Sequence, residues 1–133
     1  MRMSFDHEKL EVYQKAIVFT CWVDGLLGSI PKSLAIYNQL ERATTSIPLN
    51  IAEGNGRYTA ADRCRHLDIA RGSALECAAC LDVLVAKKLI ESADDGKAML
   101  ASMVSMLVGL IRSTSPIRVH EEPADYRAET MEK

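Results

Sequence analysis

Cysteine and histidine are the residues in this sequence most able to do chemistry. Cys77 and Cys80 are separated by two residues, the spacing of a redox or zinc motif, and Cys64 and His66 could supply further ligands. Cys64 and Cys77 fall in one predicted helix, however, and lie about 20 Å apart along its axis at about 1.5 Å per residue. Because zinc ligands converge on one ion, we predict no metal and no other cofactor, and we interpret the cysteines as reduced packing residues.

The glycines and histidines do not form a recognisable catalytic or phosphate-binding motif. The run Gly54-Asn55-Gly56 follows a predicted helix rather than a strand and lacks the lysine and hydroxyl of a phosphate-binding loop, so we interpret it as a turn. His66 stands one turn after Asp62, which favours an ordinary surface pair over a catalytic dyad. No Ser-His-Asp or Cys-His arrangement is discernible in the sequence. We therefore expect no enzymatic activity.

Charged side chains gather in the middle of the chain. The basic residues there are Arg42, Arg57, Arg63, Arg65 and Arg71, and the interleaved acidic residues are Glu53, Asp62, Asp68 and Glu76. We interpret most of this group as a solvated network of ion pairs. A nucleic-acid patch formed by the four arginines from Arg57 onward is the alternative interpretation.

The composition predicts that helices position these residues. The chain has 133 residues, which fits one domain. Hydrophobic residues make up 48% of it and aromatic residues 5%, a mixture that suits helix packing better than strands. The formal net charge is -2, so no overall basic field exists to concentrate nucleic acid or an anionic membrane.

Apolar residues recur at spacings of three and four in four stretches, which predicts four helices over about residues 6–27, 33–54, 60–90 and 97–113. Pro48 lies inside the second stretch, but the periodicity resumes in register after it, so we interpret it as a kink. Thr59, followed three residues later by Asp62, is the predicted N-cap of the third helix. The run from Asp94 to Gly96 is interpreted as a turn before the fourth.

These elements predict an all-α fold, an antiparallel up-and-down four-helix bundle over residues 1–116, followed by a charged, mobile tail over residues 117–133. The bundle region holds thirteen acidic and thirteen basic side chains, so the net negative charge belongs to the tail. The longest nearly apolar run, residues 16–23, is too short to cross a membrane, and no secretory signal precedes it. We therefore expect a cytoplasmic protein with no membrane partner.

Asn50 occupies an inward position of the second predicted helix. A buried amide must find hydrogen-bonding partners, so it can fix how two helices align. We favour this structural role for Asn50 over a role in binding.

A short turn near Arg57 makes the second and third predicted helices antiparallel neighbours, and residues whose numbers sum to about 114 to 118 should face each other. This register places Arg42 within reach of Glu76, and Glu53 within reach of Arg65. It predicts that at least one of these ion pairs forms as a structural clamp.

The first and fourth predicted helices are apolar round most of their circumference, over residues 16–23 and 99–111. A four-helix bundle needs only one apolar stripe on each helix. The surplus apolar surface should be buried between copies of the chain, so we expect a homo-oligomer.

Three motif segments together resemble a known family. They cover residues 39–43, residues 46–54 with Arg57, and residues 70–76, and residues 5–16 and 30–32 also fit its pattern. Over residues 5 to 90 the sequence is similar to the bacterial four-helix bundle proteins that include those encoded in intervening sequences of 23S ribosomal RNA genes. The resemblance implies an up-and-down bundle, ring-like pentamers and no enzyme activity. It also implies kinship with the accessory proteins of diversity-generating retroelements, which bind a reverse transcriptase and nucleic acid.

Two classes of function follow. The first is an oligomeric scaffold or interaction module that binds another protein, and the second is a nucleic-acid-binding accessory factor. We rank the first higher because the bundle is neutral, and because Glu41 stands where the family often carries a basic residue.

Overall fold

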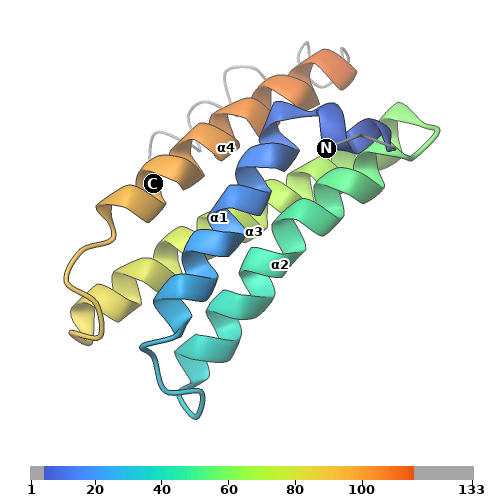
Figure 1. The fold of residues 1–133 in the computed structure, drawn as a ribbon. Helices are drawn as coiled ribbons and strands as arrows, with labels where there is room; N and C mark the ends of the chain where they lie inside the picture. The colour runs from blue at the N-terminus through green and yellow to red at the C-terminus, as the bar shows by residue number, and fades with distance from the viewer. Residues whose placement is uncertain (1–4, 116–133) are drawn as a thin grey trace.

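The computed structural model describes residues 5–115, which form four α-helices and one short 3-10 turn with no strand in that range (Figure 1). The elements are η1 (Asp6–Lys9), α1 (Glu11–Leu27), α2 (Ala35–Asn55), α3 (Ala60–Ala86) and α4 (Asp94–Thr114). The all-α, four-helix fold class predicted from the sequence is confirmed. The tail proposed for residues 117–133 lies outside the described residues.

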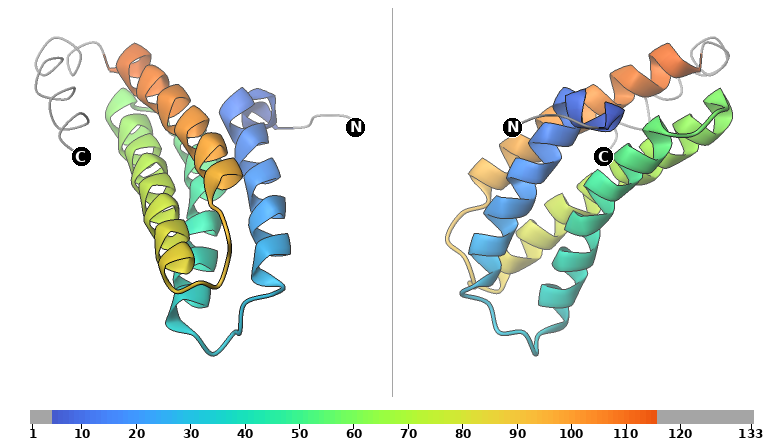
Figure 2. Two further views of the ribbon diagram at one scale, coloured as in Figure 1. Left: turned by 90° about the vertical axis from the view of Figure 1, so that its left-hand side faces the viewer. Right: turned by 45° about the vertical axis from the view of Figure 1, so that its right-hand side comes forward.

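Successive helices run in opposite directions, which is the up-and-down arrangement expected from their short connections. The α1–α2 and α3–α4 connections lie at one end of the bundle, and the α2–α3 turn lies at the other (Figures 1 and 2). The α2–α3 contact is the most extensive, while α1 packs on α2 and α4, and α4 also packs on α3. The motif segments of α2 and α3 are thereby brought side by side.

The core lies along the bundle axis and takes one apolar stripe from each helix. Its largest fully buried side chains are Phe19, Leu40, Ile47, Ile51, Leu81, Leu84, Met103 and Leu107. Burying a side chain of this size contributes about 1.5–3 kcal/mol relative to leaving it in water. This stripe holds the two faces of α2 and α3 in fixed positions.

Two predictions are confirmed, namely that α2 continues past Pro48 and that Thr59 caps α3. Pro48 is buried within α2, and the helix continues past it to Asn55. The Thr59 hydroxyl oxygen accepts a hydrogen bond from the Asp62 amide at 3.1 Å, which caps the start of α3.

The predicted end of α3 near residue 90 is wrong by four residues. Lys88 adopts φ 62°, the left-handed conformation, and its amide donates to the Val85 carbonyl at 2.9 Å. The Leu89 amide donates to the Leu84 carbonyl at 2.9 Å, which completes a Schellman-type helix end. Glycine usually occupies the left-handed position of this motif, so a lysine there gives no indication in the sequence that the helix ends.

The predicted start of α4 at residue 97 is also wrong. Asp94 and Asp95 form the first turn of the helix rather than a preceding turn. The Ser92 hydroxyl oxygen accepts from the Asp94 amide at 3.1 Å, and the two carboxylates favour the positive end of the helix dipole. α2 begins at Ala35, two residues later than predicted, after the extended residue Leu34.

Gly96 provides a test of close packing between α1 and α4. A Cβ at this position would lie 2.6 Å from the ring of Trp22 and 2.8 Å from Leu81 Cδ1. Gly96→Ala should therefore lower the free energy of unfolding by about 1–3 kcal/mol, measured by urea denaturation. Gly72→Ala is the matched control, because an added Cβ meets nothing within 4 Å there and alanine is the better helix former. Equal stability of the Gly96 variant and wild type would contradict the packing described for α4.

Candidate functional site

A chain of hydrogen-bonded side chains, here called the polar seam, joins α2 to α3 through Ser73, Ser46, Asn50 and His66. The hydroxyl oxygens of Ser73 and Ser46 are 2.8 Å apart. Asn50 Nδ2 donates to Ser46 Oγ at 3.0 Å and to the Ser46 carbonyl at 2.9 Å. Asn50 Oδ1 lies 3.1 Å from His66 Nδ1. Asn50 thus makes the contact between the two helices that its inward position indicates.

The surface position predicted for His66 is wrong. It is buried, with 6% of its surface exposed, and bonds to Asn50 rather than forming a surface pair with Asp62. Because the Asn50 amide nitrogen is committed to Ser46, the amide oxygen faces the ring, and His66 Nδ1 carries the proton that it donates. On the other side of the ring, Nε2 lies 3.4 Å from Arg65 Nη2 and 3.7 Å from Glu53 Oε2.

Room for His66 comes from Gly54 on the opposite helix. A Cβ added to Gly54 would lie 2.9 Å from His66 Cβ and 3.3 Å from the Arg63 carbonyl oxygen. The helices can approach this closely only where one of them has no side chain. The signals that could have located His66 were inward Asn50, which the predicted register places opposite it, and inward Gly54 one turn further along α2.

The predicted register between α2 and α3 is close to the observed one, but neither predicted ion pair forms. Glu76 Oε2 accepts a hydrogen bond from Gln39 Nε2 at 2.7 Å, and no ion pair joins it to Arg42. Glu53 pairs with Arg57, which lies just beyond the end of α2, and Arg65 contacts His66. Long side chains select among neighbours three and four residues away, and the register alone does not determine that choice.

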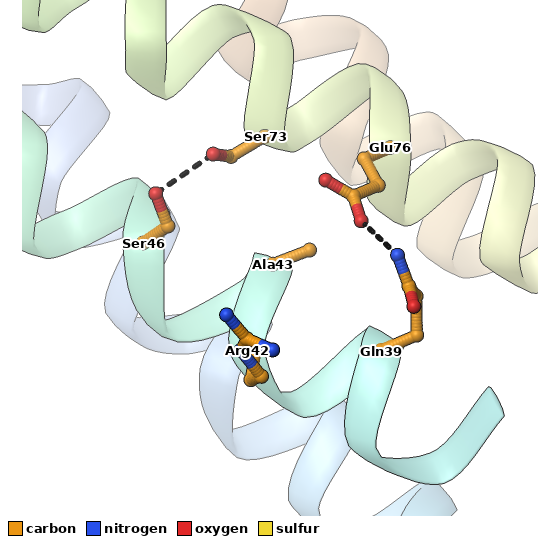
Figure 3. Close-up of a pocket in the computed structure, with 6 residues that line it drawn as sticks. All are labelled: Gln39, Arg42, Ala43, Ser46, Ser73 and Glu76. Carbon is orange, nitrogen blue, oxygen red and sulfur yellow. Dashed lines mark hydrogen bonds between the residues drawn. The ribbon is translucent and has the colours of Figure 1, made fainter. Parts of the chain in front are cut away.

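A polar pocket opens beside the seam, here called the α2–α3 pocket. Its six lining residues are Gln39, Arg42, Ala43, Ser46, Ser73 and Glu76 (Figure 3). The pocket has a volume of about 270 Å³. Ala43 is buried, the two serines are half-buried, and the remaining three side chains are exposed. Two hydrogen bonds across the pocket, from Gln39 to Glu76 and from Ser73 to Ser46, tie α2 to α3 on either side of Ala43 (Figure 3).

The arginines of the α2–α3 turn and the first half of α3 divide into those paired with a carboxylate and those that are not. Arg71 pairs with Asp68 at 3.0 Å, and Arg57 pairs with Glu53, as expected for an ion-pair network. Arg63 Nε instead donates to the Arg57 carbonyl at 2.9 Å, which ties the start of α3 to the turn. Neither Arg63 nor Arg65 pairs with a carboxylate among the described residues.

The cysteines do not assemble into a reactive centre. Cys64, Cys77 and Cys80 are buried free thiols, and within residues 5–115 no group of histidine, cysteine and acidic side chains has the geometry to hold a metal ion. Burial raises the pKa of the Cys77 thiol from 9.0 to about 11, while the hydrogen bond with Thr44 acts in the opposite direction. A thiol with a raised pKa stays protonated near neutral pH and is a poor nucleophile.

Comparison with known proteins identifies the family. The model of the family described as 23S rRNA-intervening sequence protein matches residues 8–109, which span α1, α2, α3 and most of α4. The chain belongs to this family. No curated protein matches it.

A similar solved structure agrees with this family assignment at the level of the fold. It is the crystal structure of a protein of unknown function from the S23 ribosomal protein family of Bacteroides thetaiotaomicron VPI-5482. The TM-score is 0.71 with 24% sequence identity, covering 76% of this chain and 98% of the other. The fold of the 23S rRNA-intervening sequence protein family is thus shared at low sequence identity.

In this member of the family, the polar seam predicts a stability cost for truncating Asn50. Asn50→Ala leaves the buried Nδ1 proton of His66 without its acceptor, which should lower the free energy of unfolding by about 1–3 kcal/mol. Asn38→Ala on the exposed side of the same helix is the matched control and should change stability by about 0.5 kcal/mol or less. Chemical denaturation of both variants provides the measurement, and equal midpoints would show that the seam does not stabilise the helix pair.

Proposed function

We propose that this protein acts by binding rather than by catalysis, that it works as a ring-like homo-oligomer, and that its partner is a protein. The observation that carries the proposal is the apolar surface that α4 and α1 leave outside the core of a single chain. A pentamer is the preferred ring because of the family resemblance, and closed cyclic symmetry places equivalent surfaces around one axis.

On α4, the face formed by Leu100, Met103, Leu107 and Ile111 is buried in the core of its own chain. Further apolar side chains on the same helix are only half-buried, and they are Met99, Val104, Met106, Val108 and Leu110. On α1, Val18 is 61% exposed and Ile17 is 40% exposed. Apolar surface of this extent on both helices is typical of a contact between subunits.

A hollow between α1 and α4 offers a place for such a contact. Its lining includes Leu10, Val12, Met106 and Leu110, and its volume is about 280 Å³. A side chain from a neighbouring subunit would fill it and remove more apolar surface from water. Each buried methylene group contributes about 0.8 kcal/mol to association.

By length and composition alone, α4 is long and apolar enough to span a membrane. It is the one such helix among the described residues. One helix of this kind is weak evidence for a membrane, and one face of α4 is already packed in the core. Burial between subunits accounts for the apolar residues on the other face of α4 without a membrane.

Charge favours a protein over nucleic acid as the partner. Thirteen acidic and thirteen basic side chains precede residue 117, so each subunit lacks the excess positive charge that drives counterion release from phosphates. Glu53 and Asp68 neutralise two of the arginines nearest the α2–α3 turn.

The oligomer can be tested by placing a charge on the proposed contact. Light scattering of the full chain at micromolar concentration should give a mass several times 14.7 kDa. Val18→Glu should reduce that mass towards a single chain, because a buried unpaired carboxylate opposes association. Leu49→Glu is the matched control, since Leu49 is equally exposed, at 62%, but lies on α2. A mass near 14.7 kDa for wild type would refute the ring.

Nucleic-acid binding is a second candidate, and a specific group of residues favours it. At the α2–α3 turn, Tyr58 is 98% exposed, and Arg63 and Arg65 lack carboxylate partners among the described residues. Exposed aromatic rings stack on unpaired bases, and arginines hold the phosphates on either side. A ring would present this group several times and add affinity by multivalency.

Filter binding with a single-stranded RNA oligonucleotide separates the two candidates. Because the bundle is neutral, we expect affinity weaker than micromolar at about 50 mM salt. Tighter binding that weakens steeply with added salt would make the second candidate the better one, provided that replacing Arg57, Arg63 and Arg65 with glutamine abolishes it. The control removes the same charge at the opposite end, by replacing Lys32, Lys87 and Lys88 with glutamine.

A further inference from the structure

The α2–α3 pocket holds two opposite charges that do not pair with each other. Arg42 and Glu76 both line it, yet no salt bridge or hydrogen bond joins them. Within the described part of the chain, nothing contacts the Arg42 guanidinium through a hydrogen bond or an ion pair. The Glu76 carboxylate is held by Gln39 through Oε2 at 2.7 Å, which leaves Oε1 available. The pocket therefore presents one cationic and one anionic group.

The two serines add a hydrogen-bond donor. Ser46 Oγ accepts from Asn50 Nδ2 at 3.0 Å and lies 2.8 Å from Ser73 Oγ. The Ser73 hydroxyl donates its proton to Ser46 Oγ, and the Ser46 hydroxyl proton has no acceptor among residues 5–115. A hydroxyl carries one proton and two lone pairs, so the second proton can be donated to a ligand. The seam fixes both serines in place because it continues through Asn50 to buried His66.

The position of the pocket coincides with the motif segments. All six lining residues fall within residues 39–43, 46–54 and 70–76, the three segments that carry the family resemblance. α2 supplies four of them and α3 supplies two. The three segments therefore meet at this pocket (Figure 3).

The size and charge of the pocket disfavour a small molecule and a nucleic-acid phosphate as its ligand. Its volume of about 270 Å³ is below the range of about 300–1,000 Å³ typical of small-molecule sites, and it is open to solvent along three exposed side chains. A nucleic-acid phosphate would meet the Glu76 carboxylate. Exposed charges also gain little from a small ligand that leaves them in water, whereas a protein partner covers them and strengthens each contact.

We propose that the α2–α3 pocket binds a segment of a partner protein that presents a carboxylate to Arg42 and a lysine or arginine to Glu76. The partner's carboxylate accepts from the guanidinium and from the spare serine hydroxyl, and its cationic group donates to Glu76 Oε1. This inference rests on the proposed function, in which the protein binds another protein, and it locates the surface involved. The arrangement also gives direction, since a segment with the two charges exchanged would face like charges in the pocket.

Selection from a displayed library of random peptides against the full-length protein tests the inference. The enriched peptides should share one acidic and one basic residue at a fixed spacing. Synthetic copies should lose about tenfold or more in affinity, measured by fluorescence anisotropy, on R42Q and on E76Q. Lys87→Gln is the control, because it removes an exposed charge from the end of α3 outside the pocket.

A charge exchange makes the result independent of folding defects. The double variant R42E/E76R should reject the selected peptides and bind copies in which the acidic and basic residues are exchanged. The proposal would be overturned if the enriched peptides lacked a charged pair or if R42Q and E76Q left their binding unchanged. It would also be overturned if no peptide were enriched. Peptides that bind wild type tightly and are unaffected by R42Q and E76Q would support a protein partner while excluding this pocket, so the two proposals can fail separately.

Discussion

The apolar stripe holds α2 against α3, and the hydrogen bond between Asn50 and buried His66 favours one register along that stripe. A slip of one turn would leave the His66 proton without an acceptor inside the bundle, at a cost of about 1–3 kcal/mol. It would also move Gly54 away from His66 and bring a side chain into a space that accepts none. With this alignment fixed, Ser46 meets Ser73 and Gln39 meets Glu76. The polar contacts along the pocket all belong to this one register.

Periodicity predicts the fold well because burial of an apolar stripe dominates the energetics of a bundle. The four helices, the continuation past Pro48 and the Thr59 cap all depend on local spacing or on the chemistry of one residue. Helix ends are predicted less well where a residue adopts an unusual conformation for its type. Lys88 ends α3 in a left-handed conformation that nothing in its side chain indicates.

The candidate site was only partly predictable, for a different physical reason. Its segments and the role of Asn50 could be read from the sequence, but the burial of His66 depends on a glycine in another helix. The partner of Glu76 depends on which long side chain, Gln39 or Arg42, reaches it at lower cost in rotamer entropy and desolvation. Both outcomes are decided by tertiary geometry. Because Arg42 and Glu76 do not pair with each other, the Arg42 guanidinium and Glu76 Oε1 are available to a ligand.

The short α2–α3 turn also has a consequence for the order of folding. The most extensive helix contact in the bundle joins two helices that are adjacent in sequence, so little chain entropy is lost in closing the loop between them. The α1–α4 contact joins segments from opposite ends of the chain and carries a larger closure cost. This topology favours early formation of the hairpin that holds the pocket, because the contact between α1 and α4 has to close a much longer stretch of chain.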